Sequence, residues 1–494
     1  MERKDNEKIN GNKVLSNLFW RFLERCGAQG VTFIVSIVLA RLLDPGVYGV
    51  IALVTVYTSI LDVFVDSGLG NALIQKKDAD ELDFSSVFYF NICMCLVLYA
   101  GMFFAAPAIA SFFGMPELVA LVRVLSLTLV VSGVKNIQHA YVSRNMLFKR
   151  FFYATLGGTV TAAVVGIWMA YRGYGVWALV TQNLVNVTID TVILWIMVKW
   201  RPKRMFSFQR LKVLFSYGWK LLASELIDTV YNKLRQMIIG KLYTSEDLAF
   251  YNRGEQIPQF LTNNINTATN SVLMPAMSAE QDQPTRVKSM TRRAITVSTY
   301  VMMPVMAGLA VCARPLVSLI LTDKWLPAVP FLQIFCVSYA FLPFHIANLN
   351  AVKAMGRSDL FLKMEILKKV IELAILAAAM WVSPLVMALS VLVCGVISQI
   401  INSWPNRKLI GYSYGEQLKD MLPNILLSAG MGAIVYAAGL LPVENIFKLL
   451  IQVPLGILIY ILGSRLLKNR NYDYILSIFR NMIRRKKQNT GETT

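Results

Sequence analysis

Fourteen apolar segments, each long enough to cross a bilayer, follow one another along this 494-residue sequence. A hydrocarbon core about 30 Å thick is crossed by about 20 helical residues, so the segments predict fourteen transmembrane helices. They lie at 14–40, 46–70, 84–113, 115–142, 151–171, 175–199, 211–240, 247–277, 294–322, 326–352, 359–382, 384–405, 418–440 and 445–466. The predicted fold class is therefore an all-α, polytopic membrane protein.

Basic residues alternate between the connections that join these segments. The even-numbered connections and both tails hold most of the Lys and Arg residues, whereas the odd-numbered connections hold only Arg41, Arg172, Lys241 and Lys324. Cytoplasmic connections of membrane proteins carry an excess of Lys and Arg. The alternation predicts that both termini lie in the cytoplasm and that the chain sits in an inner or plasma membrane.

Composition excludes several classes of protein. The chain is 56% hydrophobic with a mean hydropathy of +0.52, which is too apolar for a soluble two-domain protein. Its net charge of +20 lies in connections and tails, which predicts contact with anionic membrane lipids and no nucleic-acid partner. The six cysteines lie inside predicted spans without a Cys-x-x-Cys pair, and the only histidines are His139 and His345. We therefore expect no metal site, no cofactor and no catalytic residue.

The sequence contains a weak internal repeat with a period of about 200 residues. Arg41-Leu-Leu precedes a short turn and Tyr48-Gly49, and Lys241-Leu-Tyr precedes a short turn and Phe250-Tyr251. Six spans return the chain to its starting side, so the halves would be parallel repeats. The predicted parts are a tail at 1–13, a six-helix bundle at 14–199, a basic linker at 200–210, a second six-helix bundle at 211–405, two further helices at 418–466, and a basic cytoplasmic tail at 467–494 with an amphipathic helix.

Ionisable residues form stripes on the first two predicted spans. Arg21, Glu24 and Arg25 share one broad face of span one, and Asp62 and Asp66 share a face of span two. A charge at the bilayer centre costs about 2.5–3.5 kcal/mol on insertion scales, so such residues face protein or water. Because span two returns to the side from which span one enters, these charges lie at matched depth and can offset one another's desolvation.

Spans seven and eight repeat this pattern in the second half. Lys220, Asp228, Tyr231 and Arg235 align on span seven, and a polar row that includes Gln259 lies on span eight. Such a row against lipid would leave donors and acceptors unpaired, which predicts a wet cavity between the halves. The candidate cavity residues are Arg21, Glu24, Arg25, Asp62, Asp66, Lys220, Asp228, Tyr231, Arg235, Glu255, Gln259 and Asn263.

A purely structural interpretation fits some of these charges. Interhelical hydrogen bonds in membranes are worth about 0.6 kcal/mol each and need no transport role. On span eleven, Glu365, Lys368, Lys369 and Glu372 share a face and can neutralise one another, so we interpret them as structural or as a lateral rim. Arg235 and Glu255 lie near the outer end, where a gate or a surface cluster is the alternative.

The sequence resembles the polysaccharide flippase branch of the multidrug/oligosaccharidyl-lipid/polysaccharide exporter superfamily, and is most similar to the lipopolysaccharide or colanic acid exporter type. The resemblance rests on Leu-Ala-Arg-Leu-Leu-Asp-Pro-Gly-Val-Tyr-Gly at 39–49, on Asp-Ser-Gly-Leu-Gly-Asn-Ala-Leu-Ile-Gln at 66–75 and on Asp-Lys-Trp at 323–325. It implies a V-shaped pair of six-helix bundles that moves lipid-linked sugars by alternating access. The family's cationic cavity maps onto Arg21, Arg25 and Lys220.

The function that this resemblance implies is export of a polyprenyl-diphosphate-linked oligosaccharide across the bacterial cytoplasmic membrane, for surface polysaccharide biosynthesis. Arginine suits a diphosphate, and amides and tyrosines suit sugar hydroxyls. A proton or sodium ion is the expected coupling ion, and a polysaccharide polymerase and glycosyltransferases are the expected protein partners. The alternative is a cation-coupled multidrug antiporter of the same superfamily. A membrane enzyme is disfavoured because no outer connection exceeds about eight residues.

Overall fold

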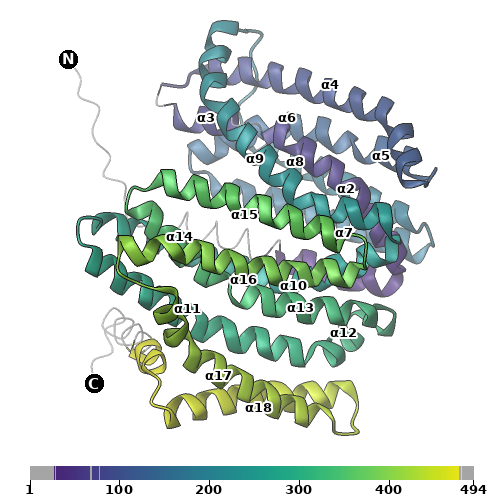
Figure 1. Ribbon diagram of the computed structural model, residues 1–494. Helices are drawn as coiled ribbons and strands as arrows, with labels where there is room; N and C mark the ends of the chain where they lie inside the picture. The colour runs from purple at the N-terminus through teal and green to yellow at the C-terminus, as the bar shows by residue number, and fades with distance from the viewer. Residues whose placement is uncertain (1–26, 28, 67–68, 77, 478–479, 481–494) are drawn as a thin grey trace, which may run out of the picture. The chain divides into compact units, whose positions relative to one another are not determined.

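The computed structural model describes residues 27, 29–66, 69–76, 78–477 and 480, and these residues form helices and turns without any strand (Figure 1). The chain divides into two compact units, unit 1 at Met1–Ala249 and unit 2 at Phe250–Thr494. Ten helices of the described residues are long and apolar enough to cross a membrane. The chain is therefore a multi-pass helical membrane protein.

Unit 1 is built from nine helices of the described residues. The first is an apolar helix at Gln29–Leu42. The others are α2 (Pro45–Asp66), α3 (Leu69–Gln75), α4 (Glu81–Phe113), α5 (Leu118–Leu125), α6 (Leu127–Arg144), α7 (Phe148–Tyr171), α8 (Val176–Met197) and α9 (Phe208–Leu242). α7 packs on α8 and α4 packs on α6, while α9 packs on α2, α3 and α4.

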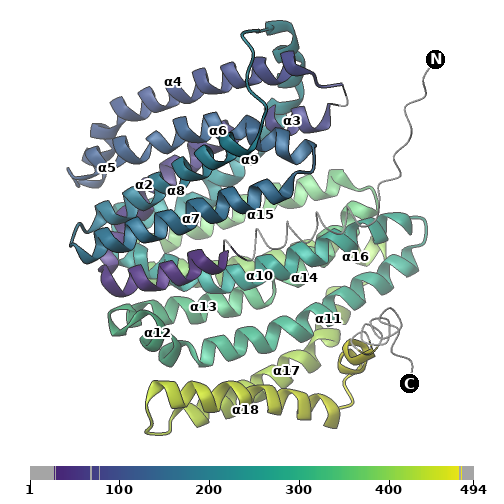
Figure 2. The ribbon, with the colours of Figure 1, turned by 180° about the vertical axis from the view of Figure 1, so that it is seen from behind.

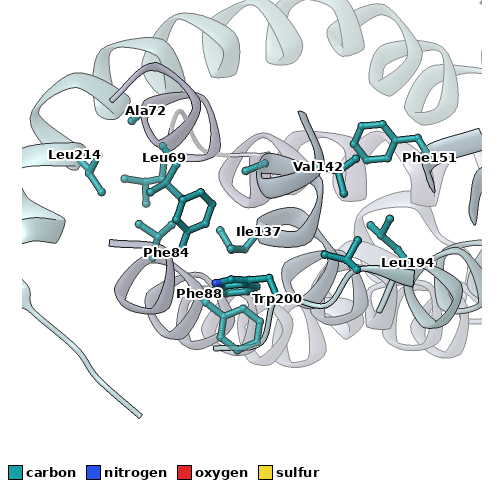
Figure 3. Packing of buried hydrophobic residues seen from close by; sticks show 14 of the residues in the cluster. Leu69, Ala72, Phe84, Phe88, Ile137, Val142, Phe151, Leu194, Trp200 and Leu214 are labelled. Atoms are coloured by element: carbon teal, nitrogen blue, oxygen red, sulfur yellow. The ribbon is translucent and has the colours of Figure 1, made fainter. Parts of the chain in front are cut away.

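The linker before α9 is docked on unit 1 by a buried apolar cluster. Figure 3 shows Trp200 beside Phe84 and Phe88 of α4. The ring centroids of Phe84 and Phe88 lie 5.8 and 6.1 Å from that of Trp200. The backbone N–H of Lys203 donates to Ser85 Oγ at 3.1 Å, and that of Ser207 donates to Ser86 Oγ at 2.9 Å. These contacts place α9 in unit 1, which ends at Ala249. The division into two six-helix repeats stays a prediction.

Unit 2 contains the remaining helices. They are α10 (Ser245–Ala279), which begins just before the unit boundary, α11 (Pro284–Val311), α12 (Ala313–Leu321), the 3-10 helix η1 (Asp323–Ala328), α13 (Val329–Ala340), α14 (Leu342–Ala354), α15 (Ser358–Ala379), α16 (Pro384–Leu409), α17 (Tyr414–Gly439) and α18 (Asn445–Leu466). The last two run side by side in both views (Figure 1 and Figure 2). Tyr460 Oη of α18 donates to the Tyr300 carbonyl of α11 at 2.7 Å.

Among the described residues, three predicted spans are interrupted by a break between helices. Spans four, nine and ten break at Ser126, Cys312 and Phe341. Two of these breaks lie two or three residues before a proline, Pro315 or Pro343, which lacks the N–H that would bond to the carbonyl four residues earlier. Nothing in the structure explains the break at Ser126.

The helix boundaries of the two halves share an offset. The helix at 29–42 ends at Leu42 and α2 begins at Pro45, while α9 ends at Leu242 and α10 begins at Ser245. Each pair is joined by a two-residue turn, at 43–44 and 243–244. The spacing of 200 residues seen in the sequence therefore recurs in where the helices end and restart.

Candidate functional site

The ten apolar helices leave out four of the fourteen predicted spans, namely spans one, seven, eight and eleven, and each of the four carries a polar stripe. Span two also carries a stripe, but it is among the ten. α9 and α10 have 35 residues each and α15 has 22, so their length suffices for a crossing. Span one contributes the short apolar helix Gln29–Leu42 in the described part of the chain. Polarity, not length, sets α9, α10 and α15 apart.

Two of the residues predicted to line a cavity lie on α2 of unit 1. Asp62 is half-buried on α2, and Asp66 is the last residue of that helix. Arg21, Glu24 and Arg25 lie outside the described residues. The predicted pairing of arginines with Asp62 and Asp66 therefore stays a prediction.

The candidate residues on α9 differ in exposure. Lys220 and Asp228 are exposed, whereas Tyr231 and Arg235 are half-buried. A 35-residue helix is about 52 Å long, and Lys220 lies about 18 Å along it from Phe208. An exposed lysine and aspartate at such depths cannot face hydrocarbon without a large cost, so this face of α9 requires water or a polar partner.

The polar row of α10 is partly satisfied by α13 and α14 of the same unit. Tyr339 Oη donates to Glu255 Oε1 at 2.9 Å, and Asn350 Nδ2 donates to Asn270 Oδ1 at 2.6 Å. The helices approach closely because Gly254 has no side chain: an added Cβ would lie 2.5 Å from Phe331 Cβ. Glu255 therefore has a structural hydrogen bond in addition to any role in transport.

Two other members of the row, Gln259 and Asn263, are exposed. Asn266, between them and Asn270, is 6% exposed, and its side-chain oxygen has no hydrogen-bond partner among the described residues. A buried acceptor without a donor costs about 1–3 kcal/mol, which makes this part of α10 favourable for a bound water or a substrate hydroxyl.

Sequence reasoning missed an ion pair inside unit 1. Lys135 Nζ of α6 lies 3.0 Å from Asp190 Oδ2 of α8, with side chains 25% and 16% exposed. Asp190 is the only charged residue of α8, and Lys135 is nine residues from Arg144, the other charged residue of α6, so neither belongs to a charged stripe. The signal that could have found them is the lone charge itself, since an intramembrane charge needs a partner.

The charges on α15 are engaged within unit 2. Lys368 is 8% exposed and its Nζ lies 2.6 Å from Glu365 Oε1, while Ser398 Oγ of α16 donates to Glu372 Oε1 at 3.3 Å. These bonds fit the structural interpretation of this stripe.

One end of unit 1 is basic. Arg144 donates to the carbonyls of Leu73 and Lys76, each at 2.7 Å. Lys76 Nζ lies 2.5 Å from Asp83, which is fully buried, and Arg210 lies 3.7 Å from the same carboxylate. A hydrogen bond from the Asp83 backbone N–H also lowers the pKa of the neighbouring Asp80 carboxyl.

The opposite end of unit 1 has few basic residues. Lys241, at the end of α9, donates to the Phe112 carbonyl near the end of α4, with its Nζ 4.6 Å from the Phe112 ring centroid. Gly46, at the start of α2, lies beside Glu246, since its Cβ would be 3.5 Å from Glu246 Cγ. The connections rich in basic residues therefore lie at one end of the folded unit, and the connections with few basic residues lie at the other end.

The two ends of unit 2 differ in the same way. Lys288 lies 3.5 Å from Glu416, and Arg292 pairs with Asp420 at the adjoining ends of α11 and α17. At the other ends of α12 and α18, Asn445 Nδ2 donates to Ser318 Oγ at 3.0 Å.

The fold of this chain occurs in solved structures of membrane transporters. The solved structure titled lipid II flippase MurJ, inward closed conformation, is similar to it with a TM-score of 0.74 at 13% identity, covering 92% of this chain and 98% of that chain. An inward-facing multidrug resistance MATE family transporter of the MOP superfamily gives 0.61 at 17% identity, covering 78% and 94%. The chain has the fold of these transporters.

The family model described as polysaccharide biosynthesis protein matches residues 38–330, more than half of the sequence, and the chain belongs to this family. The match confirms the resemblance predicted from the motif at 39–49. The succinoglycan biosynthesis transport protein ExoT of Rhizobium meliloti is 24% identical over 68% of this chain and 68% of its own length. The lipopolysaccharide biosynthesis protein WzxC of Escherichia coli is 22% identical over 87% and 88%. The teichuronic acid biosynthesis protein TuaB of Bacillus subtilis is 24% identical over 82% and 85%.

Proposed function

We propose that this chain is a flippase that moves polyprenyl-diphosphate-linked oligosaccharide units across the bacterial cytoplasmic membrane for surface polysaccharide biosynthesis. Family membership and the transporter fold support the class. The observation that carries the substrate chemistry is the exposed polar face of α9, with Lys220 and Asp228 on a helix long enough to span the membrane. In this proposal the two six-helix bundles form a V around a cationic cavity and work by alternating access.

The chemistry of such a substrate matches the polar groups available. A diphosphate head group requires cations and strong donors, which Lys220, Arg235 and the predicted Arg21 and Arg25 supply. Sugar hydroxyls require amides and hydroxyls, which Gln259, Asn263 and Tyr231 supply. The lipid tail stays in the bilayer while the head group crosses. Both termini are cytoplasmic in this proposal, a proton or sodium ion drives the cycle, and a polymerase and glycosyltransferases act on either side of the step.

The fold also occurs in a multidrug transporter, so a cation-coupled drug antiporter is the alternative. The two substrates have opposite charge. A lipid-linked diphosphate needs fixed positive charge in the cavity, whereas a cationic drug is repelled by it.

Charge reversal at Lys220 separates these functions. Lys220→Glu should abolish export of surface polysaccharide, and lipid-linked precursor should accumulate on the cytoplasmic side. Lys220→Gln should give an intermediate loss, because glutamine keeps hydrogen-bond donors without the charge. Lys212→Glu is the matched control, an exposed lysine in the second turn of the same helix, and it should export normally.

Precursor accumulation and dye efflux are measured side by side in cells that lack the native gene, at matched protein levels. Normal export by Lys220→Glu would refute the cationic cavity. A wild-type chain that expels cationic dyes but never restores polysaccharide would assign it to the antiporters.

A further inference from the structure

A basic cavity lies in unit 2, and none of its described lining residues belongs to α9 or α10. It has a volume of about 550 Å³ and is formed by α11, α17 and the segment that follows α18. Small-molecule sites commonly occupy about 300–1,000 Å³. Its charged lining residues are Arg292, Arg293, Lys419, Lys468, Arg470 and Asp420.

Asp420, the one acidic residue among the described residues that line this cavity, is already neutralised. Arg292 forms an ion pair with Asp420, and Tyr412 Oη donates to the other carboxylate oxygen at 2.7 Å. Burial, and then the bond to Asp420, raise the pKa of Tyr412 above its ordinary value, so it stays a donor. Among the described residues no carboxylate lies within ion-pair distance of Lys419, Lys468 or Arg470. The cavity therefore carries an excess of positive charge.

The walls of the cavity are held together by side-chain bonds. Asn424 Nδ2 of α17 donates to the Thr296 carbonyl of α11 at 2.9 Å, and Asn469 Nδ2 donates to Asn424 Oδ1 at 3.1 Å. The Arg293 guanidinium lies 4.0 Å from the Tyr474 ring centroid. These contacts fix the segment that carries Lys468 and Arg470 against α11 and α17, so the cations are positioned before any ligand binds.

The cavity adjoins an apolar surface at the ends of three apolar spans. α11, α17 and α18 are all long and apolar enough to cross a membrane. Leu467 lines the cavity and is 66% exposed, and Leu466 beside it is 82% exposed. Leu422, next to the lining residue Pro423, is 49% exposed. A ligand that fits is one with an anionic head and an apolar body.

We propose that this cavity binds the phosphate head group of an anionic phospholipid, with its acyl chains on the adjoining leucine surface. Basic pockets between transmembrane helices are suited to such head groups. Arginine and lysine donate charge-assisted hydrogen bonds to phosphate oxygens. Lipid bound at this site stabilises the junction of α11, α17 and the segment after α18. This proposal does not depend on the flippase proposal.

The test measures thermal unfolding of the full chain in a neutral detergent. Phosphatidylglycerol is titrated against phosphatidylcholine, and inorganic phosphate and glycerol phosphate form separate arms. Phosphatidylglycerol should raise the unfolding midpoint of the wild-type chain, and the other three should not. The variant Lys468→Gln/Arg470→Gln should need about 30-fold more phosphatidylglycerol for half of the shift, since each surface cation contributes about fivefold.

The matched control is Arg407→Gln/Lys408→Gln, an exposed basic pair at the end of α16 that does not line the cavity. It should respond to phosphatidylglycerol like the wild-type chain. Equal responses of the two double variants would overturn the proposal, because the lipid would then act through general charge. Equal protection by inorganic phosphate would overturn the lipid as the ligand. If the double variant fails to fold, Lys419→Gln alone should show a fivefold loss, and no loss would refute the site.

Discussion

At the scale of single residues, the charges inside this chain are mostly paired within their own unit. Lys135 pairs with Asp190 and Glu365 with Lys368. Pairing offsets the cost of a charge in the membrane, and removing one partner exposes that cost again. Lys220 and Asp228 on α9 differ, since both are exposed, and this difference is what makes α9 a candidate for substrate contact.

The Lys135–Asp190 pair provides a test of this principle. Lys135→Met should destabilise the chain by about 3 kcal/mol, because it leaves the largely buried Asp190 carboxylate without a counterion. The double variant Lys135→Met/Asp190→Leu should recover most of that loss, since replacing both partners by apolar groups removes the uncompensated charge. Unfolding midpoints and yields in detergent report both effects. A double variant as unstable as the sum of its single variants would show that the pair is not coupled.

At the scale of elements, the fold depends on close contacts where one helix ends and the next begins. Gly49 of α2 lies against the backbone of Ser245 at the start of α10, and a Cβ at Gly49 would lie 1.7 Å from the Ser245 carbonyl oxygen. The motif at 39–49 thus contains a glycine for which the structure gives a steric reason. Gly240 of α9 lies similarly close to Leu53 of α2.

Substitution of Gly49 should therefore disturb helix packing. Gly49→Ala should cost about 1–3 kcal/mol, because the opposing group is backbone and cannot rotate away. Gly101→Ala on α4 is the control, since nothing lies within 4 Å of its Cβ position, and alanine there should be neutral or stabilising by up to about 1 kcal/mol. Unfolding midpoints in detergent distinguish the two. Equal midpoints for both variants would contradict the close approach.

At the scale of the whole molecule, hydropathy and charge alternation predicted the helical membrane class, and the motif at 39–49 predicted the family. Both follow from local composition. Contacts between distant residues could not be read in this way: α9 belongs to unit 1 through Trp200 and its linker, and Lys135 meets Asp190 across two helices. The interruptions at Cys312 and Phe341 follow from proline positions, but many prolines lie inside helices without ending them, as Pro107 does in α4.

The orientation of the chain in the membrane depends on basic residues that are spread over the whole sequence. Reporters fused at Asp44, Lys241 and Lys324 should read as extracytoplasmic, and those at Lys203 and Lys288 as cytoplasmic. In unit 1, Lys241 lies at the end with few basic residues and Lys203 lies at the basic end, where it pairs with Glu81. Basic connections remain on the cytoplasmic side during insertion, which assigns a side to each end.

Alkaline phosphatase, which is active only outside the cytoplasm, and a fluorescent protein that matures only inside it give opposite signals at each position. Matched expression of the fusions controls for poorly inserted protein. The reporter at Lys241 is decisive, because Lys241 lies at the end of α9, a helix more polar than the ten apolar helices. A cytoplasmic signal there would mean that α9 does not cross the membrane, and both the fourteen-span topology and the parallel repeat would then be wrong.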